Sequence, residues 1–532
     1  LTLSHPATNT QRTATTNTAG VYNLPALAPG LYTLKVEQAG FATQVRSDIE
    51  LQVGQVARLD FVLRVGNLSE VVEVVGGAPM LQTETTALGT VIENKRILEL
   101  PLNGRNYLQL ASLIPGATTS AAPSRVGQLR MGGSRNDFTL NISGQRFTFN
   151  HYALDGIENT DINFNTYLFL PSIDALQEFK VESGLVQAEY GRATAQVNVM
   201  TRSGTNDLHA TWFEFLRNSR LDAKNYFDQA RDPIPPFKRN QFGFTVGGPV
   251  FIPRVVNGKD KLFFMFDYEG LRERKALTQL ATVPFADQRG GDLSRFPRQV
   301  FDPRSQATDA AGRVISVSPF PGNIIPQNRI HPISGKVFRD HFPLPNRSTT
   351  VEANNFLNTE GRRSDSDQET ARIDWVQSAG SSWFFRYSQS GELQYIPKNI
   401  PRQGNNADVK VRQGVLGNTR VFGPNKVNDF RFGVSRLEAL NINTRAFKEN
   451  TVAELGIADF PTNNPLYFGV PVFNISGFSS VGDCDDCPFV NFDTVMQAKD
   501  DFSWTRGKHS FKLGTDLRRT RFNQTGAGRV RG

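Results

Sequence analysis

The sequence predicts a mainly β protein with a small N-terminal β-sandwich, a mixed α/β domain, and about nine antiparallel strands of a transmembrane β-barrel. The composition supports this, because 40 Phe and 45 Gly against 5 Met favour many short strands and turns. Strand-like segments of the second half alternate aromatic with polar residues. Short and long connections between these segments also alternate, as they do in membrane barrels.

Residues 1–66 are expected to form the sandwich. A Pro-Gly turn precedes a strand that places Tyr32, Leu34 and Val36 on one face. Gly-x-Tyr, Pro-Gly-x-Tyr and Gly-Phe then follow one another over residues 20–41, and this series resembles the carboxypeptidase regulatory-like domain. The resemblance implies an immunoglobulin-type sandwich without catalytic activity. Its opening strand is not recognisable, so we expect a chain truncated at its N-terminus.

Residues 79–205 carry four motifs in a fixed order: a Leu-Asp-Gly-Ile strand, a helix-strand over residues 173–181, a Tyr-Gly pair and a closing strand. The motif residues are Leu154, Asp155, Gly156, Ile157, Tyr190, Gly191 and Asn198. This ordered series resembles the plug of TonB-dependent outer-membrane receptors. A Leu-Asn-Gly-Arg-Asn run near residue 102, which opens an expected short helix, is most similar to the Oar-like branch. Arg202 departs from the family pattern, which usually has Lys there.

Residues 67–78 are a linker whose β-prone run ends in a Gly pair. The run consists of Ser69, Glu70, Val71, Val72, Glu73, Val74 and Val75. One interpretation is a last strand of the sandwich, since clustered valines are typical of any strand. The other follows from the resemblance: transporters with this sandwich carry a TonB box at this junction, the strand that a TonB-type energy-coupling protein captures. Both interpretations stay open at this stage.

Residues 206–532 are expected to form part of the barrel. Phe430 and Phe432 alternate with Arg431 and Gly433, and the same pattern recurs around residues 244, 266, 373, 385 and 513. Aromatic weight on one face and charge on the other is typical of strands between lipid and a polar lumen. The first strand is expected near residues 208–217, running outward.

The connections fall into two classes. Short turns are expected at residues 257–260, 378–381, 423–426 and 506–509, and long irregular stretches at residues 271–368, 392–408 and 438–494. Tight periplasmic turns and extended external loops produce this alternation. An open sheet would leave two edges unpaired in hydrocarbon, at several kcal/mol for each unsatisfied backbone group. The resembling family closes its barrel at about 22 strands, so we expect a fragment of a longer protein.

The sequence favours neither an enzyme nor a nucleic-acid-binding protein. It contains no His-Glu-x-x-His, Gly-x-Ser-x-Gly, Walker or dinucleotide-binding motif, and no cofactor is expected. The formal charge of +8 comes from 59 basic and 51 acidic residues that are spread along the chain rather than clustered. No apolar stretch reaches the roughly 18 residues of a transmembrane helix.

Two short motifs remain. Cys484 and Cys487 are expected to form a disulfide that rigidifies an external loop, with a soft metal held by the Cys-Asp-Asp-Cys run as the alternative. Asp161 and Asn163 have the spacing of a calcium loop, but the required Gly and bidentate Glu are missing. We therefore interpret that segment as a solvated loop and expect no metal.

The resemblance implies a TonB-dependent transporter that imports a scarce ligand, such as a siderophore or an oligosaccharide, through a plugged barrel. Its expected partners are a TonB-type energy-coupling protein at the N-terminal box, outer-membrane lipid and lipopolysaccharide, and an unknown external ligand. The expected location is the outer membrane of a Gram-negative-type bacterium, with the N-terminal domain in the periplasm. The alternative is an Oar-like surface protein acting in adhesion or export.

Overall fold

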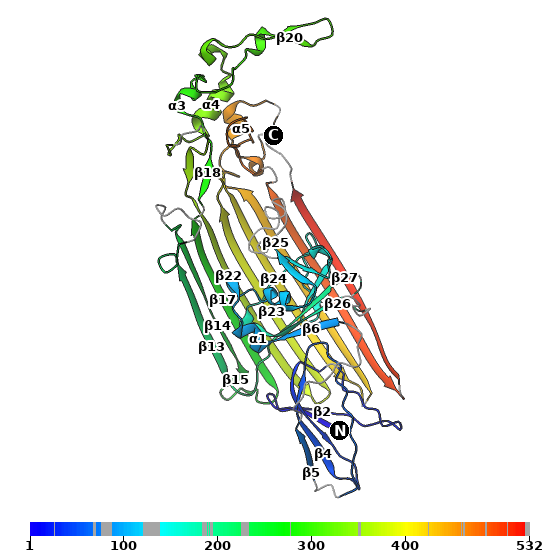
Figure 1. Cartoon of the computed structure of the whole chain (residues 1–532). Helices are drawn as coiled ribbons and strands as arrows, with labels where there is room; N and C mark the ends of the chain where they lie inside the picture. The colour runs from blue at the N-terminus through cyan, green and yellow to red at the C-terminus, as the bar shows by residue number, and fades with distance from the viewer. Residues whose placement is uncertain are drawn as a thin grey trace.

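The computed structural model describes the chain apart from a set of short segments. These are residues 26, 67–70, 76–87, 121–138, 184–188, 190, 192–194, 225–233, 277, 349–352, 424, 459, 461–462, 485–486, 508 and 527–532. The described residues form three bodies: an N-terminal domain, an inner domain, and a long antiparallel sheet that we call the wall (Figure 1). The expected mainly β class is confirmed.

The N-terminal domain contains a five-stranded sheet in the order β2-β1-β3-β4-β5. Its strands are β1 (Thr2–His5), β2 (Thr10–Thr13), β3 (Gly30–Val36), β4 (Thr43–Leu51) and β5 (Val71–Val75). Tyr32, Leu34 and Val36 lie on the buried face, where they form a core with Leu3 and Ile49. Leu59, Phe61 and Leu63 also pack against this core but lie outside the described strands.

Strand β5 bears on the two interpretations of residues 69–75. It pairs in parallel with β4, from Thr43 opposite Val71 to Ser47 opposite Val75. The described part of the run is therefore the last strand of this sheet, and it lies at the edge of the sheet. Ser69 and Glu70 lie outside the described residues.

The inner domain, residues 88–201, contains a five-stranded sheet in the order β10-β9-β12-β11-β6 and a separate β7-β8 pair. Its strands are β6 (Leu88–Glu93), β7 (Ala117–Ser120), β8 (Thr139–Ile142), β9 (Asn150–Leu154), β10 (Ile157–Glu158), β11 (Leu176–Ser183) and β12 (Ala195–Thr201). Its helical segments are α1 (Asn94–Glu99), η1 (Asn103–Arg105), η2 (Tyr107–Leu113), η4 (Phe147–Phe149) and η5 (Ile173–Ala175). The helix expected after residue 100 is thus two 3₁₀ segments, and α1 precedes it.

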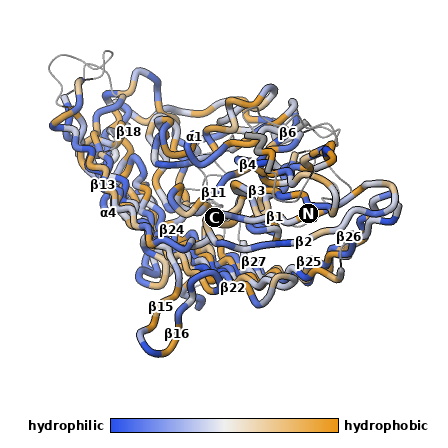
Figure 2. The backbone as a smooth tube through the Cα atoms, turned by 90° about the horizontal axis from the view of Figure 1, so that it is seen from below, coloured by the Kyte–Doolittle hydropathy of each residue, from blue (hydrophilic) through white to orange (hydrophobic). Residues whose placement is uncertain are grey.

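The wall is a nine-stranded sheet in which every pair of neighbours is antiparallel. Its strands are β13 (His209–Asn218), β14 (Phe237–Pro249), β17 (Leu262–Ala276), β22 (Gly361–Ser378), β23 (Ser381–Ile396), β24 (Asn405–Val421), β25 (Lys426–Asn443), β26 (Phe489–Arg506) and β27 (His509–Gly526). Seen from below, the wall curves partly around the inner domain (Figure 2).

The two faces of the wall differ as the alternation predicts. Phe385 on the outer face is 47% exposed, whereas the neighbouring Arg386 on the inner face is fully buried. The same contrast separates the exposed Phe432 from Gln413 and Ser435, which are buried. The inner domain lies against this polar inner face, where buried polar residues such as Arg386 and Gln413 contact protein.

Several expected connections are shorter or longer than predicted. Residues 361–368, 392–396 and 405–408 were expected to be irregular but belong to strands β22, β23 and β24. Residues 361–368 are polar on both faces of β22, so alternation does not reveal that end. Between β14 and β17 the short turn expected at residues 257–260 is part of a longer connection that contains β15 (Phe251–Ile252) and β16 (Val256–Asn257).

The long connections gather at the end of the wall opposite the N-terminal domain (Figure 1). We call the described parts of residues 278–360, 397–404 and 444–488 the distal unit, because they share an apolar core that includes Val283, Ile400 and Val481. Its elements are β18 (Gln279–Ala281), α3 (Ala286–Arg289), η7 (Pro303–Ser305), β19 (Ala307–Thr308), β20 (Val314–Ser316), η8 (Pro321–Asn323), η9 (Gln327–Arg329), α4 (Pro332–Asp340), β21 (Phe356–Asn358), α5 (Thr451–Leu455) and η10 (Pro465–Tyr467). Among the described residues, no helix has the length and apolar character to span a bilayer.

Candidate functional site

The Leu-Asp-Gly-Ile motif forms the turn between β9 and β10. Asp155 and Gly156 both have positive φ, 49° and 81°, in which Gly is at ease and Asp is tolerated. Thr201, at the end of β12, holds the Asp155 carboxylate: its backbone N and its Oγ1 each donate to it over 2.9 Å. The carboxylate is thereby aimed out of the inner domain toward the wall.

Three arginines of the wall converge on this turn. Nε of Arg386 on β23 lies 2.6 Å from Oδ2 of Asp155, and NH1 of Arg372 on β22 lies 3.4 Å from Oδ1. NH1 of Arg431 on β25 donates to the backbone oxygen of Asp155 over 2.9 Å. Burial raises the pKa of the Asp155 carboxyl, but Arg386 and Arg372 outweigh it and hold that pKa below its usual value. Asp155 is therefore an ionised group that needs the wall as its counter-charge.

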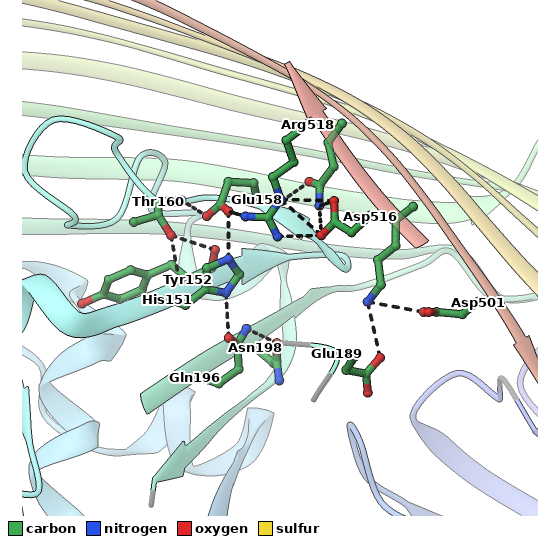
Figure 3. A network of polar contacts seen from close by, with 12 residues as sticks. His151, Tyr152, Glu158, Thr160, Glu189, Gln196, Asn198, Asp501, Asp516 and Arg518 are labelled. Atoms are coloured by element: carbon green, nitrogen blue, oxygen red, sulfur yellow. Dashed lines mark hydrogen bonds and ion pairs between the residues drawn. The ribbon is translucent and has the colours of Figure 1, made fainter. Parts of the chain in front are cut away.

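Glu158, two residues beyond Gly156, makes the second attachment (Figure 3). Its carboxylate lies 2.8 Å from Nε2 of His151 and pairs with Arg518 of β27. Its backbone N donates to Gln497 over 2.7 Å, and its backbone oxygen accepts from Gln413 over 3.0 Å. Although burial raises the pKa of Glu158, the His151 hydrogen bond and the charges of His151 and Arg518 lower it overall. One residue of the inner domain is thus bound to strands β24, β26 and β27.

A third attachment joins Glu189 to the last two strands. Its Oε2 lies 2.7 Å from Nζ of Lys512 and 3.4 Å from Nζ of Lys499. Figure 3 shows Glu189 close to Asp501, which also lies 3.3 Å from Lys499. Two lysines therefore hold Glu189 against the wall.

The Leu-Asn-Gly-Arg-Asn run supplies a fourth attachment at the other side of the wall. Arg105 pairs with Asp174 of the inner domain and lies 3.4 Å from Glu269 of β17. Its guanidinium also stacks over the ring of Phe213 on β13, 3.9 Å from the centroid. Here the inner domain provides the cation and the wall the anion, the reverse of the Asp155 attachment.

Apolar contacts also join the inner domain to the wall. Val409, Val411, Leu437 and Ala439 of β24 and β25 are buried in the same cluster as the inner domain's core. Burial of apolar surface adds on the order of 25 cal/mol per Å² without fixing direction. The ion pairs therefore determine the position of the inner domain and the apolar patch adds adhesion.

The other motif residues have structural positions. Leu154 and Ile157 are buried, and Ile157 packs against Gly433 of the wall, where a Cβ added to the glycine would lie 3.3 Å from the Ile157 Cβ. Asn198 on β12 accepts from Gln196 over 2.8 Å, and Gly191 has a φ of 68°. Tyr190 lies outside the described residues.

Sequence reasoning missed the partners of Asp155 and Glu158. Arg372, Arg386 and Arg431 occupy polar positions of alternating strands, but nothing in the sequence indicates that they meet at one turn. The available signal was that all three are arginines at positions facing the lumen. Strands that only line a water-filled lumen do not require arginine at each of these positions, so a shared anionic partner was a reasonable inference. Arg518 and Glu158 carried no comparable signal.

Cys484 and Cys487 form a disulfide in the distal unit, with Cα atoms 5.2 Å apart. Both residues are buried. No group of three or more His, Cys, Asp or Glu within the described ranges is arranged to hold a metal ion. Asp161, interpreted as part of a solvated loop, is instead buried and accepts a 2.8 Å hydrogen bond from the backbone N of Asn163.

Two regions of this chain match known domain families. Residues 200–532 match the outer membrane beta barrel domain family, and residues 1–64 match the carboxypeptidase regulatory-like domain. The TonB-dependent transporter Oar of Myxococcus xanthus is 28% identical over 303 residues, which cover 55% of this chain and 27% of that protein. The chain thus spans about a quarter of the length of this relative.

Solved structures with a similar arrangement include the outer membrane transporter YddB from Escherichia coli, at 11% identity and a TM-score of 0.47, covering 81% of this chain and 48% of that one. The ferric enterobactin receptor PfeA from Pseudomonas aeruginosa, in a mutant form, has 11% identity and a TM-score of 0.42, covering 82% and 49%. The chain spans about half of each.

Proposed function

The chain belongs to the outer membrane beta barrel domain family, whose members lie in the outer membrane of Gram-negative bacteria. From this premise we propose that it takes part in TonB-dependent import. In this proposal the inner domain is a plug, residues 206–532 contribute to a barrel of about 22 strands, and the N-terminal domain lies in the periplasm. A scarce external ligand, such as a siderophore or an oligosaccharide, binds at the distal unit and enters when the plug moves.

One observation carries the proposal: the inner domain is attached to the wall through charged groups. Asp155, Glu158, Glu189 and Arg105 each pair with a side chain of a wall strand. If the contact between the inner domain and the wall were purely apolar, the whole contact area would have to be exposed to water at once. Ion pairs can be replaced one at a time by water as the domain moves, because exposed charges are well solvated. The arrangement suits a domain that is firmly held and yet removable.

Energy must reach the plug from the N-terminal side, and β5 with the preceding Ser69 and Glu70 is our candidate for the coupling strand. An edge strand can accept a partner strand through backbone hydrogen bonds, a common mode of peptide recognition. β5 lies at the edge of its sheet, with Val72 partly exposed. A TonB-type protein would pair with this edge and pull.

The test uses the full-length natural protein in lipid nanodiscs and the purified C-terminal domain of the TonB-type protein from the same organism as the probe. Val72→Pro removes a backbone donor and disfavours strand geometry, so we expect it to abolish binding of the probe. Val72→Ala keeps the backbone and is the matched control, expected to bind as the wild type does. Equal binding by Val72→Pro, or none by the wild type, would overturn the coupling role.

A surface protein for adhesion or export is the second candidate. The distal unit favours it, because it is a folded body with its own core that extends well beyond the wall (Figure 1). Loops that merely connect strands have no need of such a core. The two candidates separate in the same experiment: a surface protein of this kind does not require the energy-coupling partner, so its wild type would fail to bind the probe.

A further inference from the structure

Within the described part of the chain, the hydrogen bonds that join the N-terminal domain to the inner domain come from the turn Gln52–Gln55, which directly follows β4. The backbone N of Val53 donates to Glu178 of β11, and Nζ of Lys180, two residues along β11, donates to the oxygen of Gly54 over 3.2 Å. Gln52 Nε2 donates to Glu93 of β6 over 3.2 Å. Three successive residues of the turn therefore each hold one of two neighbouring strands of the inner sheet.

The turn closes over a buried ion pair. Lys180 and Glu182 lie 2.6 Å apart, with side chains 2% and 1% exposed. Two glycines allow this close packing: a Cβ on Gly54 would lie 3.3 Å from Lys180 Nζ, and one on Gly89 would lie 2.8 Å from Lys180 Cε. Gly54 belongs to the N-terminal domain and Gly89 to β6, so the lysine is enclosed from both domains.

The N-terminal domain is also attached to the wall. Asn17 Nδ2 donates to the oxygen of Gly507 over 2.7 Å, in the turn between β26 and β27, and Asn23 Nδ2 donates to Thr505 over 3.0 Å. Asn206, just before β13, donates its backbone N to Ala7 over 2.9 Å. A body fixed to two places on the wall and to β11 can restrain the inner sheet.

We propose that the N-terminal domain is a clamp on the inner domain, in which the turn Gln52–Gln55 holds strand β11 in place and must let go before the inner sheet can rearrange. β11 is an interior strand of that sheet, paired with β6 and β12, so holding it restrains the sheet as a whole. The role of release in import rests on the proposed function. Strand β4 connects the turn to the candidate coupling strand, because it pairs with β5 and runs directly into the turn.

The clamp contains a group that makes it sensitive to pH. Glu178 accepts the Val53 N–H and is buried, and this burial raises its pKa to about 7, with the carboxylates of Glu50 and Glu93 adding to the rise and the Val53 N–H and Lys180 opposing it. A carboxyl whose pKa rises on docking favours docking below its ordinary pKa, and this advantage is lost as the pH rises through about 7. The clamp is therefore tight in mild acid and looser in alkali.

Lysine acetylation of the full-length protein in outer-membrane vesicles tests this, with labelling read by mass spectrometry. Lys180 is enclosed when the clamp is closed, whereas Lys35 in the N-terminal domain is exposed and serves as the internal reference. We expect Lys180 to label much more slowly than Lys35 at pH 6. The ratio of their rates should rise on the order of tenfold by pH 8.5, the change that a pKa near 7 gives.

Two variants sharpen the test. Glu178→Gln keeps an acceptor for Val53 but removes the titration, so the ratio should stay low at both pH values. Gly54→Asn has a residue tolerated at positive φ but places a Cβ against Lys180, so it should raise the ratio at pH 6. Gly40→Asn is the matched control, since Gly40 has φ +83° and open space around it.

Equal labelling of Lys180 and Lys35 in the wild type at pH 6 would overturn the clamp, as would an identical effect of Gly54→Asn and Gly40→Asn. A rise with pH that persists in Glu178→Gln would overturn the role of Glu178. The labelling reads docking alone and needs no TonB-type protein. The labelling experiment can therefore support the clamp even if β5 does not bind the TonB-type protein. The failure of one proposal is thus distinguishable from the failure of the other.

Discussion

The carboxylate of Asp155 lies 2.6 Å from the guanidinium of Arg386, and neither side chain has any exposed surface. One belongs to a tight turn of the inner domain and the other to the middle of a wall strand, far later in the chain. Because both charges are withdrawn from water, each depends on the other. This pair is the centre of the contact that fixes the inner domain to the wall.

Replacing Asp155 should loosen the inner domain. Asp155→Asn leaves Arg386 and Arg372 buried without their shared anion, a change that costs about 3–5 kcal/mol when one partner of a buried pair is removed. We expect faster proteolysis within residues 88–201 while the wall stays intact. Asp60→Asn is the control, because the exposed pair of Asp60 with Arg58 contributes little. Equal protease resistance of the two variants would contradict this.

Acid should release the inner domain. The pKa values of Asp155 and Glu158 are lower than usual, so the stabilisation they give is present above their ordinary values of 3.8 and 4.5 and is lost as the pH falls through the lowered ones. Hydrogen exchange of β9 and β12 between pH 7 and pH 3 measures this. Protection should hold through mild acid and fall in strong acid, with a smaller acid-induced loss in Asp155→Asn. Protection that stays unchanged down to pH 3, or an acid-induced loss as large in Asp155→Asn as in the wild type, would contradict this prediction.

Gly156 should tolerate no side chain. Its φ is +81°, and an added Cβ would collide with the guanidinium of Arg431. Gly156→Ala combines backbone strain of about 1–3 kcal/mol with displacement of that arginine. Gly144→Ala is the control, because Gly144 also has a positive φ, +73°, but has open space around it. The difference between the two variants therefore measures the clash with Arg431. Thermal unfolding should show a clearly larger loss for Gly156→Ala, and equal losses would mean that Arg431 is not seated there.

The disulfide of the distal unit should be present in the natural protein. Mass spectrometry of non-reduced protein isolated from outer membranes should find Cys484 linked to Cys487. Replacing both with Ser should affect only the distal unit, since a disulfide that closes so short a loop constrains the unfolded chain little. Two free thiols in the isolated protein would contradict the structure.

Much of the fold follows from local pattern. Alternation of Phe432 with Arg431 and Gly433 reveals a two-faced strand, and the Pro-Gly turn before Tyr32 reveals another. Pattern failed where both faces of a strand are polar, as at residues 361–367 of β22. It also assigned no role to Gln52–Gln55, because a turn that holds another domain has the same sequence features as a free turn.

Only the part of the site that the inner domain contributes could be predicted from the sequence. The Leu-Asp-Gly-Ile motif drew attention to Asp155, but Arg372 lies 217 residues away in sequence and meets it only because strand register and the seating of the inner domain bring them together. Register between strands joined by long loops is set by the assembled sheet. A single sequence carries the charges but not the pairing.

The seating of the inner domain is the central claim, and an engineered disulfide tests it most directly. Ile157 of β10 and Gly433 of β25 would have Cβ atoms 3.3 Å apart, close to the roughly 3.5–4.5 Å that a disulfide requires. In the Ile157→Cys/Gly433→Cys protein we expect peptide mapping without reduction to find positions 157 and 433 linked in high yield. Ile157→Cys/Phe432→Cys is the control, since Phe432 faces outward and should remain unlinked. Free thiols at positions 157 and 433, with the Cys484–Cys487 bond intact, would contradict the account.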